Sequence, residues 1–192
     1  MQRRLRFHVK HSVPLAALVL LGSGVARAQP REIPSWQANG GLQLGVAGQG
    51  RGAFWEETLF HGGGRADVLW GRKDPFSWGY GPMAGVSTNH FRDLNVAAGA
   101  SLLIPVSEYL PIVLQAGPYL RFHEGAHPGA FGSIFWGSRS FNYHSHYGMA
   151  GGLSLEARLG LDDDKERTII LAAHLDAQVM TLPFLFLFNA FR

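Results

Sequence analysis

The feature that most constrains this chain is an alternation of apolar and other side chains with a period of two residues. In the stretch LPIVLQAGPYLRF, residues 110–122, one row is apolar throughout and consists of Leu110, Ile112, Leu114, Ala116, Pro118, Leu120 and Phe122. The other row ends in Gln115, Gly117, Tyr119 and Arg121. Because successive side chains of a strand point to opposite faces, this pattern predicts a β-strand with one apolar and one mixed face.

The same alternation recurs along most of the chain after residue 40. It is clear in residues 40–50, 63–72, 76–88 and 93–105, and again after residue 146. No segment has a sustained amphipathic pattern of period 3.6, so we expect almost no helix. Short segments that are polar or contain proline separate the runs, as hairpin connections require. The sequence therefore predicts a meander of antiparallel strands in one domain.

The length of the alternating runs favours a membrane barrel over a soluble sandwich. Strands of soluble proteins usually have about 5 or 6 residues, whereas a strand tilted across an outer membrane needs roughly 9 to 11. Most runs here are at least as long as that upper value. Aromatic residues near the ends of the apolar rows match the girdles of membrane barrels. They are Trp70, Phe76, Trp78, Tyr80, Phe122, Phe184 and Phe191.

The N-terminal 28 residues have the pattern of a secretory signal peptide. Arg3, Arg4, Arg6 and Lys10 precede an apolar run that ends in the small-residue sequence ARA at residues 26–28. The whole chain has 17 Lys and Arg against 14 Asp and Glu; five of the basic residues fall in this segment, so 12 remain. The excess of basic over acidic residues is therefore due to the expected leader. Because the remainder has no such excess, a nucleic-acid partner is not expected. Because the chain has no cysteine, disulfides and thiolate sites are excluded.

The chain resembles the small eight-stranded outer-membrane barrels of the OmpA/OmpX type. The resemblance rests on the leader, the cysteine-free remainder, the alternating strands and an aromatic C-terminal segment. In that family the last strand ends on an aromatic residue recognised by the assembly machinery, whereas here Phe191 is penultimate. The resemblance implies an all-β, eight-stranded antiparallel up-and-down transmembrane β-barrel, located in the outer membrane as a monomer. Its implied partners are outer-membrane lipid and the assembly machinery, and no functional residue is carried over.

We therefore expect a signal peptide at residues 1–28, a periplasmic N-terminal segment at 29–39 and the barrel at 40–192. Eight strands can be placed in two ways. The first takes residues 147–161, 167–180 and 183–191 as the last three strands and leaves 123–146 as a long outer loop. The second makes residues 129–138 the sixth strand, 146–160 the seventh and 168–190 a long eighth strand bent at Pro183. We favour the second, since so long a structureless loop is uncommon and GSIFWGS is rich in strand formers.

The rows opposite the apolar ones collect ionisable residues that would point into the barrel. They are Arg65, Asp67, Arg121, Glu156, Arg158, His174 and Asp176. Buried charges are costly unless they are paired, so we expect a lumen polar network that plugs the barrel. This predicts a non-enzymatic protein with an envelope-structural or surface-interaction role. The alternative is a narrow ion or small-solute channel, although eight strands leave little room for water. A soluble ligand-binding barrel would need polar outward rows.

Two chemical readings receive little support, so we expect no catalytic residue, metal or cofactor. The histidines His61, His90, His123, His127, His144 and His146, with Glu124, could offer imidazole ligands, but loop histidines without cysteine are usually only solvated. The lipid A deacylase barrels carry a His-x-Ser-Asn motif with an acidic residue downstream. Here His146 and Tyr147 follow His144 where that motif has Ser and Asn, so the nucleophile is missing although Glu156 is suitably placed.

Overall fold

The computed structural model describes residues 36–52, 55–74, 76–107, 110–138, 151–162 and 165–176. These ranges contain eight strands and no helix, and thus no helix suited to crossing a membrane. The strands are β1 (Trp36–Gly50), β2 (Glu57–Trp70), β3 (Gly79–Asn89), β4 (Leu94–Ile104), β5 (Ile112–Phe122), β6 (Ala126–Ser138), β7 (Gly151–Gly160) and β8 (Arg167–Asp176).

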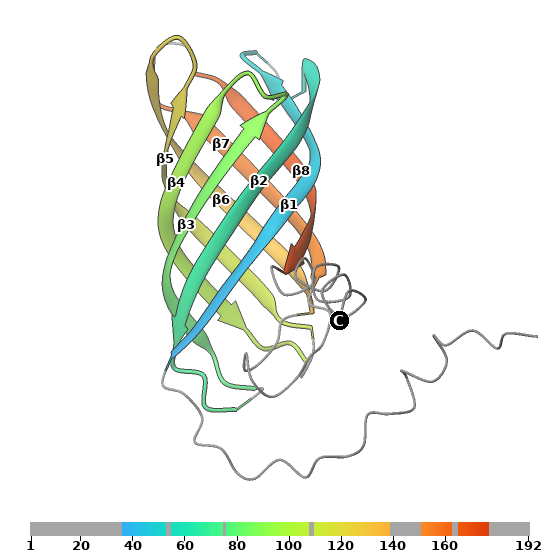
Figure 1. The fold of residues 1–192 in the computed structure, drawn as a ribbon, viewed down its shortest axis with the longest axis vertical. Coiled ribbons are helices and arrows are strands. Elements are labelled where there is room, and N and C mark those ends of the chain that lie inside the picture. Colours follow the sequence, from blue (N-terminus) through green and yellow to red (C-terminus); the bar gives the residue numbers. More distant parts are fainter. Residues whose placement is uncertain are drawn as a thin grey trace, which may run out of the picture. The chain divides into compact units, whose positions relative to one another are not determined.

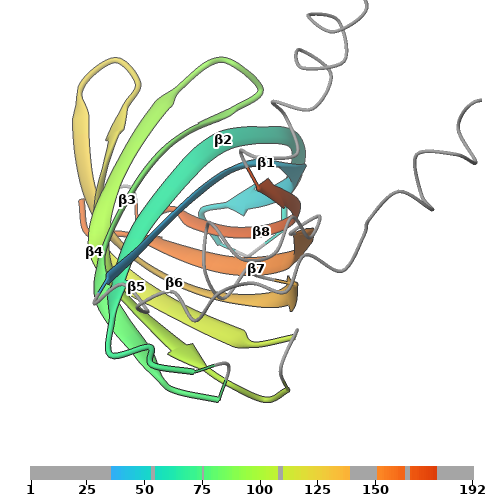
Figure 2. The same ribbon diagram turned by 60° about the horizontal axis from the view of Figure 1, so that its bottom comes forward.

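Each strand pairs antiparallel with the next, and β1 pairs with β8, so the sheet closes on itself (Figure 1). Figure 2 shows the strands curving round a single interior. The predicted fold class, an all-β antiparallel up-and-down barrel of eight strands, is confirmed. We call the end with the β1–β2, β3–β4, β5–β6 and β7–β8 connections the upper end, and the end where β1 begins the lower end.

The register fixes the stagger of the barrel. A path of directly paired residues runs around the sheet through Trp36, Trp70, Tyr80, Leu102, Leu114, Ile134, Leu155, Leu171 and Val46. The path starts at Trp36 of β1 and returns to β1 at Val46, ten residues further along. With a rise of about 3.3 Å per residue and a strand spacing of about 4.7 Å, this stagger tilts the strands by about 40°. A barrel of this size has room for side chains inside and little else.

The placement of the sixth strand decides between the two threadings. β6 occupies Ala126–Ser138, which is the segment that the first threading left as loop. The first threading is therefore wrong, because Ala126 to Ser138 alternate between the outside and the interior and pair with both β5 and β7. The second threading holds over the described residues. Its segments 146–150 and 177–190, and Pro183 with them, lie outside the description.

Some strand ends differ from the predicted ones. β1 begins at Trp36 and β2 at Glu57, both earlier than the expected 40 and 63. The second difference is residues 57–62, ETLFHG, which the structure adds to the strand through pairing with β1 and, at His61 and Gly62, with β3. The predicted signal peptide at 1–28 and residues 29–35 lie outside the described residues.

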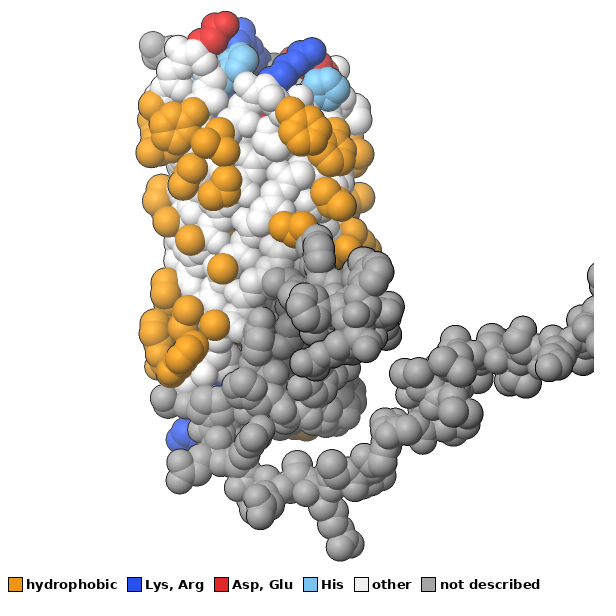
Figure 3. Space-filling model, viewed as in Figure 1, with side chains coloured by type: hydrophobic (Ala, Val, Ile, Leu, Met, Phe, Trp, Pro, Cys, Tyr) orange, Lys and Arg blue, Asp and Glu red, His pale blue; other side chains and the backbone are white. Residues whose placement is uncertain are grey.

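The two faces of the sheet have opposite chemistry. The outward rows expose large apolar side chains such as Leu44, Val86, Ile134 and Leu155, while the inward rows bury mainly polar and small residues. Within the described strands, Arg167 at the upper end of β8 is the sole charged residue of the outward rows. Figure 3 shows hydrophobic side chains along the visible flank and charged and histidine side chains at the upper end.

The interior also contains three small apolar clusters. One is Ala47, Leu59, Ile170 and Ala172, the second is Leu69, Leu103, Val113 and Phe135, and the third is Met83, Tyr119 and Phe131. Inward glycines make room for the large rings: a Cβ at Gly129 would collide with Tyr119, and a Cβ at Gly152 would meet Phe135. The polar groups of the interior are packed between these clusters.

Candidate functional site

The predicted lumen residues come from four strands. Arg65 and Asp67 lie on β2, Arg121 on β5, Glu156 and Arg158 on β7, and His174 and Asp176 on β8. All except Asp176 have buried side chains. The backbone of Asp176 pairs with Gly41 of β1, and its side chain is outside the description. Burial follows from the alternation, since each of these residues occupies the row opposite the apolar one.

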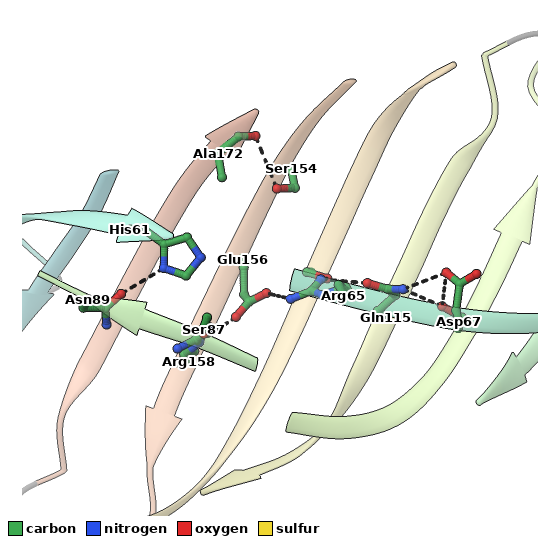
Figure 4. A network of polar contacts seen from close by, with 12 residues as sticks. His61, Arg65, Asp67, Ser87, Asn89, Gln115, Ser154, Glu156, Arg158 and Ala172 are labelled. Carbon is green, nitrogen blue, oxygen red and sulfur yellow. Dashed lines mark hydrogen bonds and ion pairs between the residues drawn. The ribbon is translucent and has the colours of Figure 1, made fainter. Parts of the chain in front are cut away.

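Glu156 is the centre of the network (Figure 4). One carboxylate oxygen forms an ion pair with Nη2 of Arg65, and the other accepts a hydrogen bond from Nε of Arg158 at 2.6 Å. Arg158 also donates from Nη2 to Ser87 Oγ at 2.9 Å. All three ionised side chains are at least nine-tenths buried, and both guanidinium groups form their ion pair with this one carboxylate.

A second branch leads from Arg65 to Asp67. Nη1 of Arg65 donates to Gln115 Oε1 at 2.7 Å and to Ser133 Oγ at 3.0 Å. The amide nitrogen of Gln115 then donates to Asp67 Oδ2 at 3.2 Å and to Ser101 Oγ at 2.6 Å. Gln115 therefore links a buried cation to a buried anion, because its amide offers both an acceptor and a donor.

Asp67 is itself held from two further strands. Asn39 of β1 donates to its Oδ1 at 3.0 Å, and Ser101 of β4 donates to its Oδ2 at 3.3 Å. The connected set thus contains two guanidinium groups and two carboxylates and is formally neutral. It draws residues from seven of the eight strands, β1 to β7, so it ties opposite walls of the barrel together.

Aromatic rings cover the two central arginines. The guanidinium carbon of Arg65 lies 5.7 Å from the centroid of Phe131, and that of Arg158 lies 5.6 Å from the centroid of Tyr119. At these distances a cation is attracted to the face of the ring. The rings belong to one apolar cluster, so the apolar and polar parts of the interior support each other.

The remaining predicted residues belong to separate groups. Arg121 forms an ion pair with Glu166, which precedes β8, and Glu166 also accepts from Thr168 at 3.4 Å. His174 packs edge-on against Phe135 with ring centroids 5.2 Å apart. His61 shares a hydrogen bond of 2.9 Å with Asn89. The structure therefore brings Arg65, Asp67, Glu156 and Arg158 together and places Arg121 and His174 elsewhere.

Several contact partners of the predicted residues are absent from the predicted set. These are Asn39, Ser87, Ser101, Gln115, Ser133 and Glu166. The first five are uncharged residues of the inward rows. Because they alternate with the outward apolar residues, their positions in the sequence could have identified them as facing the interior. Glu166 falls in LDDDKER, which reads as a turn, so no pattern connected it with Arg121.

The histidines do not assemble a metal site in the described residues, where no group of three His, Asp, Glu or Cys side chains converges. His127 instead bonds Asp162 Oδ2 at 2.5 Å through Nδ1 and the carbonyl oxygen of His123 at 3.0 Å through Nε2. These contacts link the start of β6 to the β5–β6 and β7–β8 connections. His144 and His146, with the deacylase-like segment around them, lie outside the described residues.

Comparisons with known proteins add no assignment to this geometry. No protein-family model matches the sequence, and no curated protein matches it significantly.

Proposed function

We propose that the protein is a non-enzymatic outer-membrane β-barrel whose polar interior is plugged, with an envelope-structural or surface-interaction role. The observation that carries this proposal is the chemistry of the outward rows. They present apolar and small residues over all eight strands, and in the described strands their single charge lies at the upper end. A protein in water would expose this surface at a large cost, whereas hydrocarbon is its natural solvent.

Aromatic side chains border this apolar surface at both ends. Near the lower end, Trp36 pairs with Trp70 and Trp70 pairs with Tyr80, and all three rings are exposed. Near the upper end, Phe60 and Phe122 are exposed in the same way. Rings at these positions fit the headgroup regions of a bilayer.

The height between the two aromatic levels supports the same proposal. Phe60 and Trp70 are ten residues apart on β2. That separation is about 33 Å along a strand. With a tilt of about 40°, it corresponds to about 25 Å along the barrel axis, the height of the apolar band in outer-membrane barrels.

The interior contacts favour a plug over a pore. Side chains that bridge β2, β5, β6 and β7 cross the middle of the barrel, and their charges are compensated within the network. An ion passing through would have to break several buried charged hydrogen bonds, each of which is costly to leave unmade. Outer-membrane lipid and the assembly machinery are the partners that we propose, for a monomer with no nucleic-acid ligand.

Heat-modifiability tests the proposal. The chain from residue 29 onward is refolded in detergent micelles, and its gel mobility is compared with and without boiling alongside its far-UV circular dichroism. We expect a boiling-dependent shift and a β spectrum, because a closed barrel refolded in micelles stays folded in the denaturing detergent of the gel until it is heated. The refolded protein is then inserted into planar bilayers, where we expect no steady conductance. A chain that stays soluble without detergent would contradict the membrane location, and regular conductance steps would contradict the plug.

A further inference from the structure

The upper end of the barrel holds a polar pocket that the lumen network does not use. The pocket has a volume of about 160 Å³ and is lined from β1, β2, β3, the β3–β4 turn and β5. Charged and histidine side chains gather at this end of the barrel in Figure 3. Its existence depends on the closed barrel alone, so it stands whether or not the outer surface faces lipid.

The floor of the pocket is built from buried groups. Asn89, Arg121 and Leu59 line it and are each more than nine-tenths buried. Asn89 is held by His61, which contacts its Oδ1, and by its own backbone nitrogen, which donates to Asp93 Oδ1 at 2.6 Å. Arg121 is held through Nη1 by Glu166. A floor with fixed polar groups is the feature that separates a binding site from a surface hollow.

The pocket is lined by side chains of both charges, and Arg92 is its exposed cation. Arg92, in the β3–β4 turn, lines the pocket and its guanidinium makes no hydrogen bond or ion pair with any described residue. Its backbone is fixed, because Nδ1 of His123 lies 3.2 Å from its carbonyl oxygen and its own nitrogen donates to Asn89 at 3.2 Å. Since a carbonyl oxygen only accepts, Nδ1 of His123 is the donor. The free guanidinium is thus carried on a well-held turn.

The pocket is also lined by an anion that has no partner among the described residues. Glu57, the first residue of β2, also lines the pocket, and its carboxylate has no hydrogen-bond or ion-pair partner among the described residues. Arg92 and Glu57 therefore border the same cavity with opposite charges and do not pair with each other. Two opposite charges that line one small cavity without pairing with each other are complementary to a ligand that carries both charges itself.

We propose that this pocket binds a small zwitterion of the α-amino acid class, with its carboxylate at Arg92 and its ammonium group at Glu57. Arg92 provides the planar donor set that carboxylates prefer, and Glu57 accepts from the ammonium group. The volume admits a ligand of a few heavy atoms and excludes a peptide. The role is binding at the barrel mouth, without any covalent step.

The test measures binding of L-serine to the refolded chain in micelles by calorimetry and by NMR of the arginine side-chain N–H signals. N-acetyl-L-serine, which keeps only the carboxylate, and L-serinamide, which keeps only the ammonium group, are the matched probes. We expect saturable binding of L-serine and binding weaker by about tenfold or more for each probe, since each loses one charged contact.

Arg92→Gln and Glu57→Gln are each expected to weaken L-serine binding by about tenfold or more. The controls are Lys73→Gln and Glu124→Gln, which remove exposed charges outside the pocket and should leave binding unchanged. The boiling-dependent mobility shift shows that each variant forms the barrel. The proposal is overturned if L-serine does not saturate at millimolar concentrations, if N-acetyl-L-serine binds equally well, or if either pocket variant binds like the unchanged protein.

Discussion

Arg65 of β2 and Glu156 of β7 form a buried ion pair although they are 91 residues apart in the sequence. Glu156 also accepts from Arg158, so one carboxylate is the ion-pair partner of two buried guanidinium groups. Around this centre, Gln115 extends the contacts to Asp67. The relationship makes the interior a single connected support for the barrel wall.

Removing the carboxylate of Glu156 should therefore destabilise the barrel strongly. We expect Glu156→Gln to lower the free energy of unfolding by about 3–5 kcal/mol, because both arginines lose their counter-charge while buried. Urea unfolding in lipid vesicles, followed by tryptophan fluorescence, measures the change. The control is Glu124→Gln, an exposed turn residue, for which a change within about 0.5 kcal/mol is expected. A loss below about 1 kcal/mol for Glu156→Gln would contradict the central role of this carboxylate.

Replacing the whole charged centre should cost less than breaking it. In the quadruple variant Arg65→Met, Asp67→Asn, Glu156→Leu, Arg158→Met, all four charges of the network are removed together and the side-chain volumes are roughly kept. We expect this variant to recover most of the stability that Glu156→Gln loses, measured in the same unfolding experiment. A quadruple variant less stable than the single one would show that the network contributes more than charge compensation.

Small residues inside the barrel are required by their neighbours. A Cβ at Gly129 would collide with the Tyr119 ring and with the carbonyl oxygen of Leu159, and the latter cannot move without shifting β7. We expect Gly129→Ala to destabilise the barrel by about 1–3 kcal/mol through overpacking. Gly132→Ala on the same strand is the control, because nothing lies within 4 Å of its added Cβ. Equal effects of the two substitutions would refute this account of the interior.

The β3–β4 turn holds an unusual backbone. His90 and Phe91 have φ values of 53° and 59°, and Phe91 stacks on Phe60 with centroids 5.4 Å apart. A left-handed conformation at a bulky residue destabilises the folded state by about 1–2 kcal/mol, and an aromatic stack stabilises it by about 0.5–1.5 kcal/mol.

Phe91→Gly should therefore stabilise the barrel more in a Phe60→Ala background, where no stack is lost, than in the unchanged protein. A double-mutant cycle by urea unfolding measures the difference, which we expect to be about 1 kcal/mol. A coupling free energy of zero in this cycle would mean that the stack contributes nothing to the stability of the turn.

A charge on the outer surface should distinguish lipid from water. Leu155 is exposed in the middle of β7, and Leu161 is exposed just beyond its upper end. In vesicles we expect Leu155→Lys to lower the unfolding free energy by about 2–4 kcal/mol and Leu161→Lys to change it by no more than about 1 kcal/mol. If Leu155→Lys were neutral, the outward rows would face water.

The sequence was sufficient to predict the faces of the strands, but insufficient to predict which interior residues meet. The alternation with a period of two is enough to assign four residues to the inward rows: Arg65, Asp67, Glu156 and Arg158. Their contacts depend on the stagger of ten residues around the barrel, which is set by loop lengths and turn geometry and leaves no local pattern. The pairing of Arg121 with Glu166 depends on the same register.

The sixth strand shows the same limit from another side. Residues 126–138 alternate as a strand, but their glycines and proline also fit a loop, so both threadings satisfied the local pattern. Only pairing with β5 and β7 distinguishes them. The pocket lined by Arg92 and Glu57 was not predicted either, because its residues come from four separate segments of the chain.

The most direct measurement of the central claim is a spin-label scan of β7 in lipid vesicles. The chain has no cysteine, so single cysteines can be placed at each position from 153 to 159. We predict a period of two: labels at Leu153, Leu155, Ala157 and Leu159 are accessible to oxygen dissolved in the bilayer and shielded from a water-soluble nickel chelate, while labels at Ser154, Glu156 and Arg158 are shielded from both. Outward labels that the nickel chelate reaches freely would contradict a barrel that spans the membrane.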